Sequence, residues 1–324
     1  MKILVLGGTR FVGRHMVSHF AAQGHRVVRF HRGKTTCDLP DGVEERLGDR
    51  NDDLSAVDRD EWDAVVDVSC YEPDQIRRSL NLKAARYLFI STVNVYQDVA
   101  RPGVSEDAPT IDTFDTTDEA LIYGGKKAAC ERLVMERFDG RAIVLRPGMI
   151  VGKWDNTGRF TFWCERVLRG GLFLVPGPAS RPVQFIDAAD LARFTERVLA
   201  RNLCGSYNVV GPRDTTTMED LLRECQSVTA ERGAPSARAA WVDGDFLLEN
   251  GVKPWTEMPL WLPEPQWSGV LQISNAKAVD AGLEYRPIAD SVRGVLDWMR
   301  SAPNCVIAGL ASARESELLL LVQG

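Results

Sequence analysis

ILVLGGTRFVG, at residues 3–13, is the most informative run in this chain of 324 residues. Four apolar residues lead into a glycine turn, and apolar side chains at helical spacing follow the turn. Gly7 permits a tight turn, the start of the following helix offers free N–H groups, and Gly13 lets helix and strand pack closely. The run predicts a dinucleotide phosphate site formed by Gly7, Thr9, Arg10, Phe11, Val12 and Gly13. Because Arg10 stands where such turns carry a further glycine, a turn without a ligand is the alternative.

Short apolar runs recur through the first half of the chain and alternate with amphipathic stretches. They lie at residues 3–6, 27–30, 64–68, 87–90 and 143–145. Continuous apolar runs indicate strands covered on both faces, and the alternating order requires a parallel sheet. We therefore predict an α/β fold of the Rossmann type, with a doubly wound parallel sheet.

The predicted sheet belongs to a nucleotide-binding domain of residues 1–150 and about 183–210. Tryptophan and proline concentrate beyond this first half, mainly at residues 241–267, and indicate a smaller, irregular substrate lobe. We assign residues 151–182 and about 211–300 to that discontinuous lobe. Residues 301–324 form a tail that we expect to be helical.

The composition excludes several classes of protein. Hydrophobic residues make up 44% and charged residues 26%, as in globular chains. The net charge of −6 argues against a nucleic-acid partner. The apolar run at residues 318–322 is far shorter than the roughly 20 residues of a membrane span, so we expect no membrane partner. The apolar run at residues 3–6 is too short for the core of a signal peptide, and glycines and Arg10 follow it instead of a cleavage site, so we expect a cytoplasmic location. Seven cysteines without a C-x-x-C pair indicate reduced thiols, and no set of metal ligands is evident, so no metal is predicted.

The second strand decides the cofactor preference. NAD sites place an acid at its end, but here Arg32 and Lys34 follow the strand. Because a guanidinium binds a phosphate with two hydrogen bonds, Arg32, helped by Arg10 or Lys34, favours NADP(H), with NAD(H) possible as the second choice. The alternative is that these cations are ordinary surface charges. Asp49 is a candidate for the adenine edge, or it caps a turn.

Hydroxyl groups follow a later strand, at the edge of the sheet where open α/β folds bind ligands. Ser91 and Thr92 end this strand, and we expect Ser91 to contact the cofactor. Tyr123 and Lys127 lie four residues apart and so share one helix face. An ammonium nearby, together with the positive charge of an oxidised nicotinamide, is expected to lower the pKa of the Tyr123 phenol from its reference value near 10.

At these residues the sequence resembles the short-chain dehydrogenase/reductase superfamily, in particular the extended and atypical members grouped as NAD-dependent epimerase/dehydratase proteins. The resemblance covers about residues 1–300 and rests on the turn, Asp49 and residues 91–96, 123–127, 146–148 and 185–192. It implies that Tyr123 is the general acid/base and that Thr92 orients the substrate oxygen. It also implies that Lys127 holds the nicotinamide ribose, that the turn cradles the phosphates, and that Pro147 lines the nicotinamide pocket.

Departures from the family pattern reduce the number of activities that the sequence favours. Val93-Asn94 stand where dehydratases carry Asp-Glu, so dehydration is disfavoured. Our leading hypothesis is an NADP(H)-preferring oxidoreductase that moves hydride between nicotinamide and a carbonyl or secondary alcohol of a small molecule. The alternatives are an NAD(P)-dependent epimerase that acts by transient oxidation, and a non-catalytic NAD(P)-sensing regulator. Either a monomer or a homodimer is compatible with the sequence.

Substrate residues are sought in the second lobe, whose aromatic side chains suit either a core or a pocket wall. Sugar-nucleotide epimerases place an arginine where Val183 stands here, and Arg181 lies two residues earlier. The candidates for substrate contact are Trp163, Arg166, Arg181 and Gln184.

Overall fold

A parallel sheet of seven strands organises the first half of the computed structural model, which describes residues 1–38, 40–212 and 214–323. Its order is β11-β6-β5-β4-β1-β2-β3, and every pairing between neighbours is parallel. The strands are β1 (Lys2–Leu6), β2 (Arg26–His31), β3 (Glu44–Leu47), β4 (Glu61–Asp67), β5 (Lys83–Ile90), β6 (Ala142–Pro147) and β11 (Gly205–Val209). This arrangement confirms the predicted doubly wound α/β fold.

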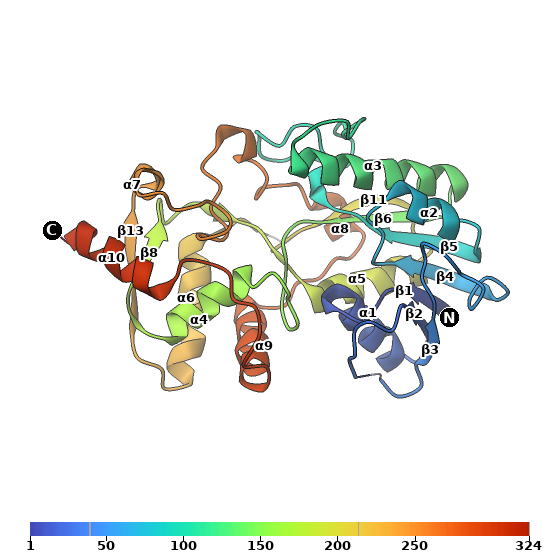
Figure 1. The fold of residues 1–324 in the computed structure, drawn as a ribbon, viewed down its shortest axis with the longest axis horizontal. Helices are drawn as coiled ribbons and strands as arrows, with labels where there is room; N and C mark the ends of the chain where they lie inside the picture. The colour runs from blue at the N-terminus through green and yellow to red at the C-terminus, as the bar shows by residue number, and fades with distance from the viewer. Residues whose placement is uncertain (39, 213, 324) are drawn as a thin grey trace.

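Helices cover both faces of this sheet (Figure 1). Alternate side chains of β1 point to opposite faces, as the pleat of a strand requires. Ile3 and Val5 pack with helices α1 (Phe11–Ala22) and α5 (Ala188–Ala200). Leu4 and Leu6 pack with helices α2 (Pro73–Ser79) and α3 (Glu119–Arg137) on the other face. The strands read as continuous apolar runs because both of their faces are buried.

A second region lies at the left of Figure 1 and has its own core. Its parallel strand pair β8 (Gly171–Pro176) and β13 (Ala237–Val242) packs with helices from distant parts of the chain. These helices are α4 (Arg159–Leu168), α6 (Met218–Glu231), α7 (Gly244–Glu249), α9 (Ile288–Ser301) and α10 (Ser312–Gln323). Two short pairings lie between the regions, β7 (Ile150–Val151) with β10 (Ile186–Asp187) and β9 (Pro182–Val183) with β12 (Thr216–Thr217).

One short helix lies outside the region that the sequence predicts for it. Helix α8 (Ala276–Asp280) falls in the range that the sequence assigns to the substrate lobe. However, Ala278 and Leu283 pack in the core beneath α1 and α5, so this segment lies against the sheet. The 3-10 turns are η1 (Val93–Val95) and η2 (Pro265–Trp267).

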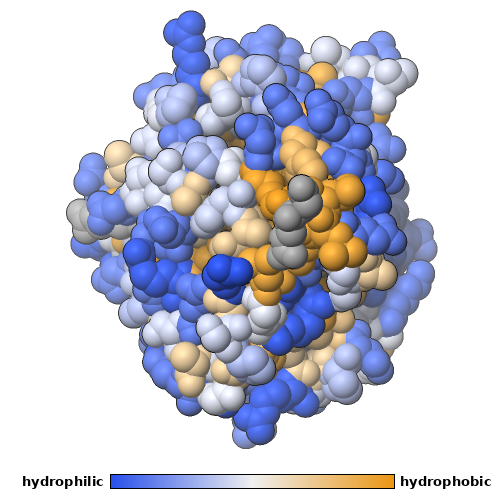
Figure 2. All heavy atoms as spheres, turned by 90° about the vertical axis from the view of Figure 1, so that its left-hand side faces the viewer, coloured by the Kyte–Doolittle hydropathy of each residue, from blue (hydrophilic) through white to orange (hydrophobic). Residues whose placement is uncertain are grey.

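Apolar side chains gather on the outer face of the second region (Figure 2). Exposed apolar residues on α7 and α10 are Leu248, Leu320, Leu321 and Val322. In the part of the chain that the structure describes, no helix combines the length and the apolar character needed to cross a membrane.

Candidate active site

The glycine turn between β1 and α1 is shaped for close backbone approach. Gly7 and Gly8 have φ angles of +104° and +91°, which L side chains rarely adopt. A Cβ on Gly13 would lie 2.7 Å from the Gly8 Cα atom, so only glycine lets the helix begin this close to the turn. The first turn of α1 contains no acidic side chain, and its leading N–H groups have no acceptor within the helix. The turn therefore offers an uncompensated positive helix end to an anion.

This turn forms one wall of a cleft of about 510 Å³, within the range of small-molecule sites. The turn residues 6–13, which include all six predicted phosphate-binding residues, line the cleft. The remaining lining comes from the ends of β2 and β4 and the loops that follow them, from the loop after β3, from α2 and from the loop before α4. The main polar contributors are Arg32, Lys34, Thr35, Arg50, Asn51, Ser69, Tyr71, Gln75 and Asn156.

Three cations lie along this cleft near the end of β2. Arg10 Nε donates a hydrogen bond to Thr35 Oγ1 at 3.2 Å, and Arg32 and Lys34 are exposed. Among the described residues, none of the three forms an ion pair. Asp49 lies close enough for Arg32 and Lys34 to contribute to the lowering of its pKa, although its hydrogen bonds with Asn51 contribute more. Those hydrogen bonds, 2.9 Å from the Asn51 amide and 2.8 Å from its side chain, engage Asp49 in a turn.

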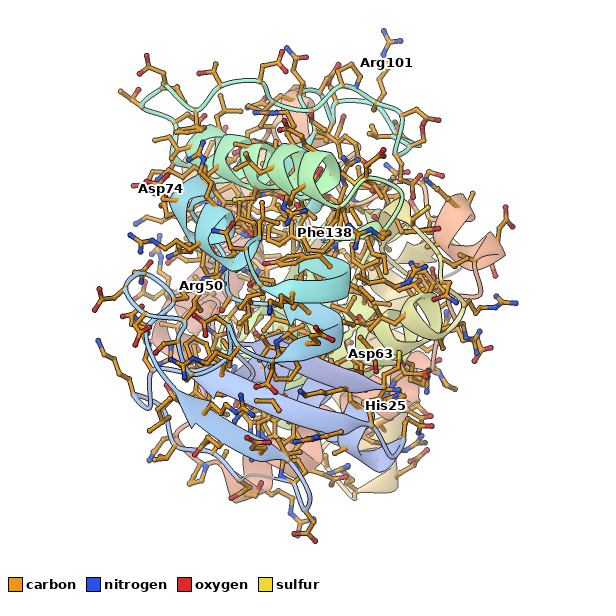
Figure 3. All side chains as sticks on the ribbon, turned by 90° about the vertical axis from the view of Figure 1, so that its right-hand side faces the viewer. His25, Arg50, Asp63, Asp74, Arg101 and Phe138 are labelled. Carbon is orange, nitrogen blue, oxygen red and sulfur yellow. The ribbon has the colours of Figure 1, made fainter. Side chains whose placement is uncertain are left out.

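Arg50 supports the floor of the cleft, and sequence reasoning missed it. Arg50 is labelled in Figure 3. Its guanidinium binds both oxygens of Asp67 at 2.6 and 2.7 Å and contacts α2 through Ser79 and the Gln75 carbonyl. Burial opposes ionisation of Asp67, but Arg50 outweighs burial and holds the pKa of this carboxyl below its usual range. The pair fixes the loop after β3 to the end of β4. Its only sequence signal is a charged residue next to Asp49 and another that ends a buried strand.

The predicted acid–base residues meet at the carboxyl end of the sheet. Asp118 caps α3 by accepting the backbone N–H groups of Ala120 and Leu121. A Cβ on Gly124 would lie 2.1 Å from the Asn94 carbonyl oxygen, so this glycine allows α3 to lie against the segment after β5. As a result the side chain of Tyr123 lies close enough to Thr92 for the Thr92 hydroxyl to affect its pKa.

The protonation of Tyr123 differs from the expectation. Burial raises the pKa of Tyr123 to about 12, the Tyr71 phenol adds to the rise, and the Thr92 hydrogen bond opposes it. The expected lowering by Lys127 is therefore wrong for the protein without a cofactor. The physical reason is that Lys127 Nζ donates to the carbonyls of Cys70 at 2.9 Å and Ile90 at 2.6 Å. Burial also lowers the pKa of Lys127.

Two other predicted cofactor residues lie at the same edge of the sheet. The backbone of Ser91 is tied to the Leu145 carbonyl at 2.7 Å. Its hydroxyl is buried, and among the described residues it has no hydrogen-bond partner. Pro147 ends β6, the neighbouring strand, and is buried. A buried hydroxyl without a partner among the described residues, at the same edge of the sheet as the glycine turn and the Lys127 ammonium, fits a polar ligand such as a dinucleotide.

Two of the predicted substrate residues are structural, which corrects the sequence-based expectation. Trp163 is fully buried and its indole Nε1 donates to the Pro259 carbonyl at 3.1 Å. Arg166 is buried against Glu315 at 2.6 Å and also donates to the Gly170 carbonyl. Both side chains therefore bind partners within the second region and stabilise its core.

The other two candidates differ from each other. Gln184 exchanges hydrogen bonds with the backbone of Ile273, at 2.9 and 3.1 Å, and lines a separate cavity of about 210 Å³. Arg181 donates from Nη1 to the Leu260 carbonyl. Its Nε and Nη2 atoms are buried, and the described residues offer them no partner. Burial lowers the pKa of Arg181 to about 10.

Comparisons with known proteins agree with this geometry. A curated relative from Arabidopsis thaliana, the chloroplast stem-loop binding protein of 41 kDa b, is 30% identical over 246 residues. The match covers 69% of this chain, and the chain spans about 62% of the length of that relative.

Solved structures share the fold at low identity. UDP-glucuronic acid 4-epimerase from Bacillus cereus with NAD superposes with a TM-score of 0.65 at 17% identity, over 93% of this chain and 97% of that one. UDP-glucose 4-epimerase from Thermus thermophilus with NAD gives 0.61 at 19% identity, over 93% and 100% of the two chains. The sequence profile of the NAD dependent epimerase/dehydratase family matches residues 3–78 and 74–210, which is more than half of the chain. The chain therefore belongs to the NAD dependent epimerase/dehydratase family.

Proposed function

We propose that this protein is an NADP(H)-preferring oxidoreductase that reduces the carbonyl of a small molecule or oxidises the matching secondary alcohol. The observation that carries the proposal is the arrangement of Tyr123 beside Thr92 and of the buried Lys127 four residues further along α3, at the carboxyl end of the sheet that also forms the glycine turn. A bound nicotinamide supplies or accepts the hydride. The chain itself supplies position and a proton.

Tyr123 is assigned the proton transfer. With a pKa of about 12 its phenol is neutral near pH 7, so it is ready to donate a proton to a developing alkoxide. In this state the phenol is the acid that reduction needs, whereas oxidation needs its ionised form as the base. Thr92 orients the reacting oxygen beside that phenol, and solvent returns the proton afterwards. Lys127 holds the nicotinamide ribose, with Ser91 and Pro147 beside it.

The cofactor preference follows from the cations of the cleft. The glycine turn and the N-terminus of α1 hold the pyrophosphate, as Gly7, Thr9, Phe11, Val12 and Gly13 are placed to do. Arg32, with Arg10 and Lys34, binds the additional phosphate of NADP(H). These cations support the proposal because no carboxylate among the described residues pairs with them. Asp49 is engaged in its own turn and is a weaker candidate for the adenine.

Arg181 points to the class of substrate. A buried guanidinium without a carboxylate partner is costly, and an anionic group of a ligand would satisfy it. We therefore assign Arg181 to a carboxylate or phosphate of the substrate. Gln184 remains a weaker candidate because its amide is already bonded to Ile273.

The test uses NADPH and a panel of aldehydes and ketones, half of them carrying a carboxylate or phosphate. Loss of NADPH absorbance with wild-type protein, abolished in Tyr123→Phe and strongest for the acidic carbonyls, is the expected result. Absence of NADPH binding, or oxidation of NADPH that survives in Tyr123→Phe, would reject the proposed mechanism.

An epimerase that oxidises and then reduces one carbon is the second candidate, since the structural neighbours include UDP-sugar 4-epimerases. It would use the same Thr92, Tyr123 and Lys127. An epimerase keeps its cofactor through turnover, so NAD(P) carried through purification favours it. Exchange with added NADPH favours the reductase.

A role without catalysis is the third candidate, as an NAD(P)-sensing regulator. The Arabidopsis relative is named for stem-loop binding, whereas this chain has a net charge of −6, and we propose no nucleic-acid partner for it. Retention of a stem-loop RNA in a gel-shift experiment at physiological salt would contradict that proposal. A cytoplasmic location and a monomeric or homodimeric state remain predictions, the second testable by light scattering.

A further inference from the structure

Tyr71 lies at the junction between the nucleotide cleft and the acid–base residues. It follows the carboxyl end of β4, and its backbone is fixed because its N–H donates to Gln75 Oε1 at 2.9 Å. Glu72, the next residue, caps α2 and pairs with Lys126 at 2.7 Å. The Tyr71 side chain, in contrast, is 56% exposed and lines the cleft. A fixed backbone thus carries a ring that is partly open to the cleft.

The surroundings of Lys127 show what this ring covers. The ammonium has three N–H donors, and the carbonyls of Cys70 and Ile90 take two of them. Two aromatic rings lie near Nζ, with centroids 4.1 Å away for Phe89 and 5.5 Å away for Tyr71.

Only one of these neighbours faces solvent. Phe89 and Cys70 are buried, and Ile90 is 7% exposed. Lys127 is itself 3% exposed. Among these four neighbours of the Lys127 ammonium, Tyr71 is the one that also lines the cleft.

We propose that Tyr71 is a positioning residue: its ring covers the third donor of Lys127, and it swings aside when a ligand hydroxyl, such as one of a ribose diol, comes to accept that donor. The identity of the ligand rests on the proposed function, because that function takes Lys127 to hold the nicotinamide ribose. That the Tyr71 ring covers Lys127 does not depend on the proposed function. A hydroxyl acceptor gives the ammonium a hydrogen bond, which is a stronger interaction than its present cation–π contact with Tyr71. This difference drives the displacement of the ring.

The position of the phenol also affects Tyr123. The Tyr71 hydroxyl lies close enough to raise the pKa of Tyr123. One side chain thus influences both members of the Tyr–Lys pair, and its displacement by a ligand would change the surroundings of both at once.

Acylation of lysines by N-hydroxysuccinimidyl acetate, read by mass spectrometry of the peptide that holds Lys126 and Lys127, tests the covering directly. Lys126 is the matched control, because it is the adjacent residue and its side chain is 28% exposed. In wild type we expect Lys127 to react roughly tenfold or more slowly than Lys126, since its reaction needs a local opening. Tyr71→Ala should largely remove this difference, and Tyr71→Phe, which keeps the ring, should preserve it.

Continued protection of Lys127 in the absence of the ring would contradict the inference. If Lys127 stays as protected in Tyr71→Ala as in wild type, while circular dichroism and thermal melting show that the variant is folded, then the carbonyls and Phe89 alone shield it and the inference is wrong. A variant that unfolds would expose lysines throughout the chain. In that case Tyr71→Leu, which replaces the ring by a shorter apolar side chain, takes the place of Tyr71→Ala in the same assay.

A second arm separates this inference from the proposed function. Saturating NADPH should protect Lys127 again in Tyr71→Ala, because the ribose takes the place of the ring. Protection by the ring without protection by NADPH would uphold the covering role of Tyr71 and reject the assignment of Lys127 to the ribose. Nuclear magnetic resonance of tyrosines labelled at Cζ adds a readout that packing alone would not change: Tyr71→Phe should lower the pKa of Tyr123.

Discussion

The two regions of the molecule hold their buried arginines in different ways. In the sheet region Arg50 pairs with Asp67 and Arg146 with Glu131, partners that lie 17 and 15 residues away in the chain. In the second region Arg166 pairs with Glu315, 149 residues away, and Arg181 has no carboxylate partner among the described residues. The sheet region thus balances its buried arginines with carboxylates that are near in sequence, whereas Arg181 in the second region has no carboxylate partner among the described residues.

The largest effect is expected at Tyr123, where the sheet region supplies the proton. Tyr123→Phe should lower turnover about 10²–10⁴-fold, because the transition state loses its proton donor. The Kd for NADPH should stay close to the wild-type value. Tyr207→Phe removes a phenol that bonds the Cys204 carbonyl elsewhere on the sheet, and it serves as the control that keeps its activity. Equal turnover of the two variants would remove Tyr123 from the mechanism.

A substitution at Arg166 tests whether the ion pair between Arg166 and Glu315 contributes to stability alone. Arg166→Met leaves Glu315 buried without its cation, so the free energy of unfolding should fall by about 3–5 kcal/mol in urea titrations. Turnover per folded molecule should not change. A large rise in KM with little loss of stability would instead restore Arg166 as a substrate contact.

Arg181 should behave in the opposite sense. Arg181→Met removes a charge that has no carboxylate partner and whose Nε and Nη2 atoms are buried without a partner among the described residues, so the free energy of unfolding should rise by about 1–3 kcal/mol. The KM for carbonyl substrates with a carboxylate or phosphate should rise, while neutral substrates should be affected little. Loss of stability in this variant would mean that the guanidinium is satisfied within the protein, and the contrast between the two regions would fail.

The smallest effect concerns pH. Carbonyl reduction needs the protonated form of Tyr123, whose pKa is raised to about 12. This form is present throughout the neutral range and is lost only as the pH rises toward that value. The profile of kcat/KM for reduction should therefore be level between about pH 6 and 9. A basic limb with a midpoint near neutrality would show that the phenol is ionised far more easily in the working enzyme.

The sheet and much of the candidate site could be predicted because their signals are local. The glycine turn, the strand-end Ser91-Thr92 pair and the four-residue spacing of Tyr123 and Lys127 each lie within one element or one turn. The fold confirms the predicted strands, and the structure brings Thr92 and Tyr123 together. Tyr71 escaped notice because a single aromatic after a strand has no pattern until its neighbours are known.

The second region could not be predicted in the same way. Trp163 is satisfied by the Pro259 carbonyl and Arg166 by Glu315, contacts that join residues 96 and 149 positions apart. Composition alone gives the same aromatic and charged residues whether they build a core or a pocket. Only the long-range packing separates Arg166, which is paired, from Arg181, which is not.

The central claim is that the cleft binds NADP(H) through the glycine turn and Arg32, and a fluorescence titration tests it most directly. Wild-type protein and Arg32→Ala are each titrated with NADPH and with NADH, following the quenching of tryptophan emission. We expect wild type to bind NADPH roughly tenfold or more tightly than NADH, and Arg32→Ala to lose that preference while NADH affinity stays unchanged. Equal affinities in wild type, a preference for NADH, or no binding of either nucleotide would contradict the account.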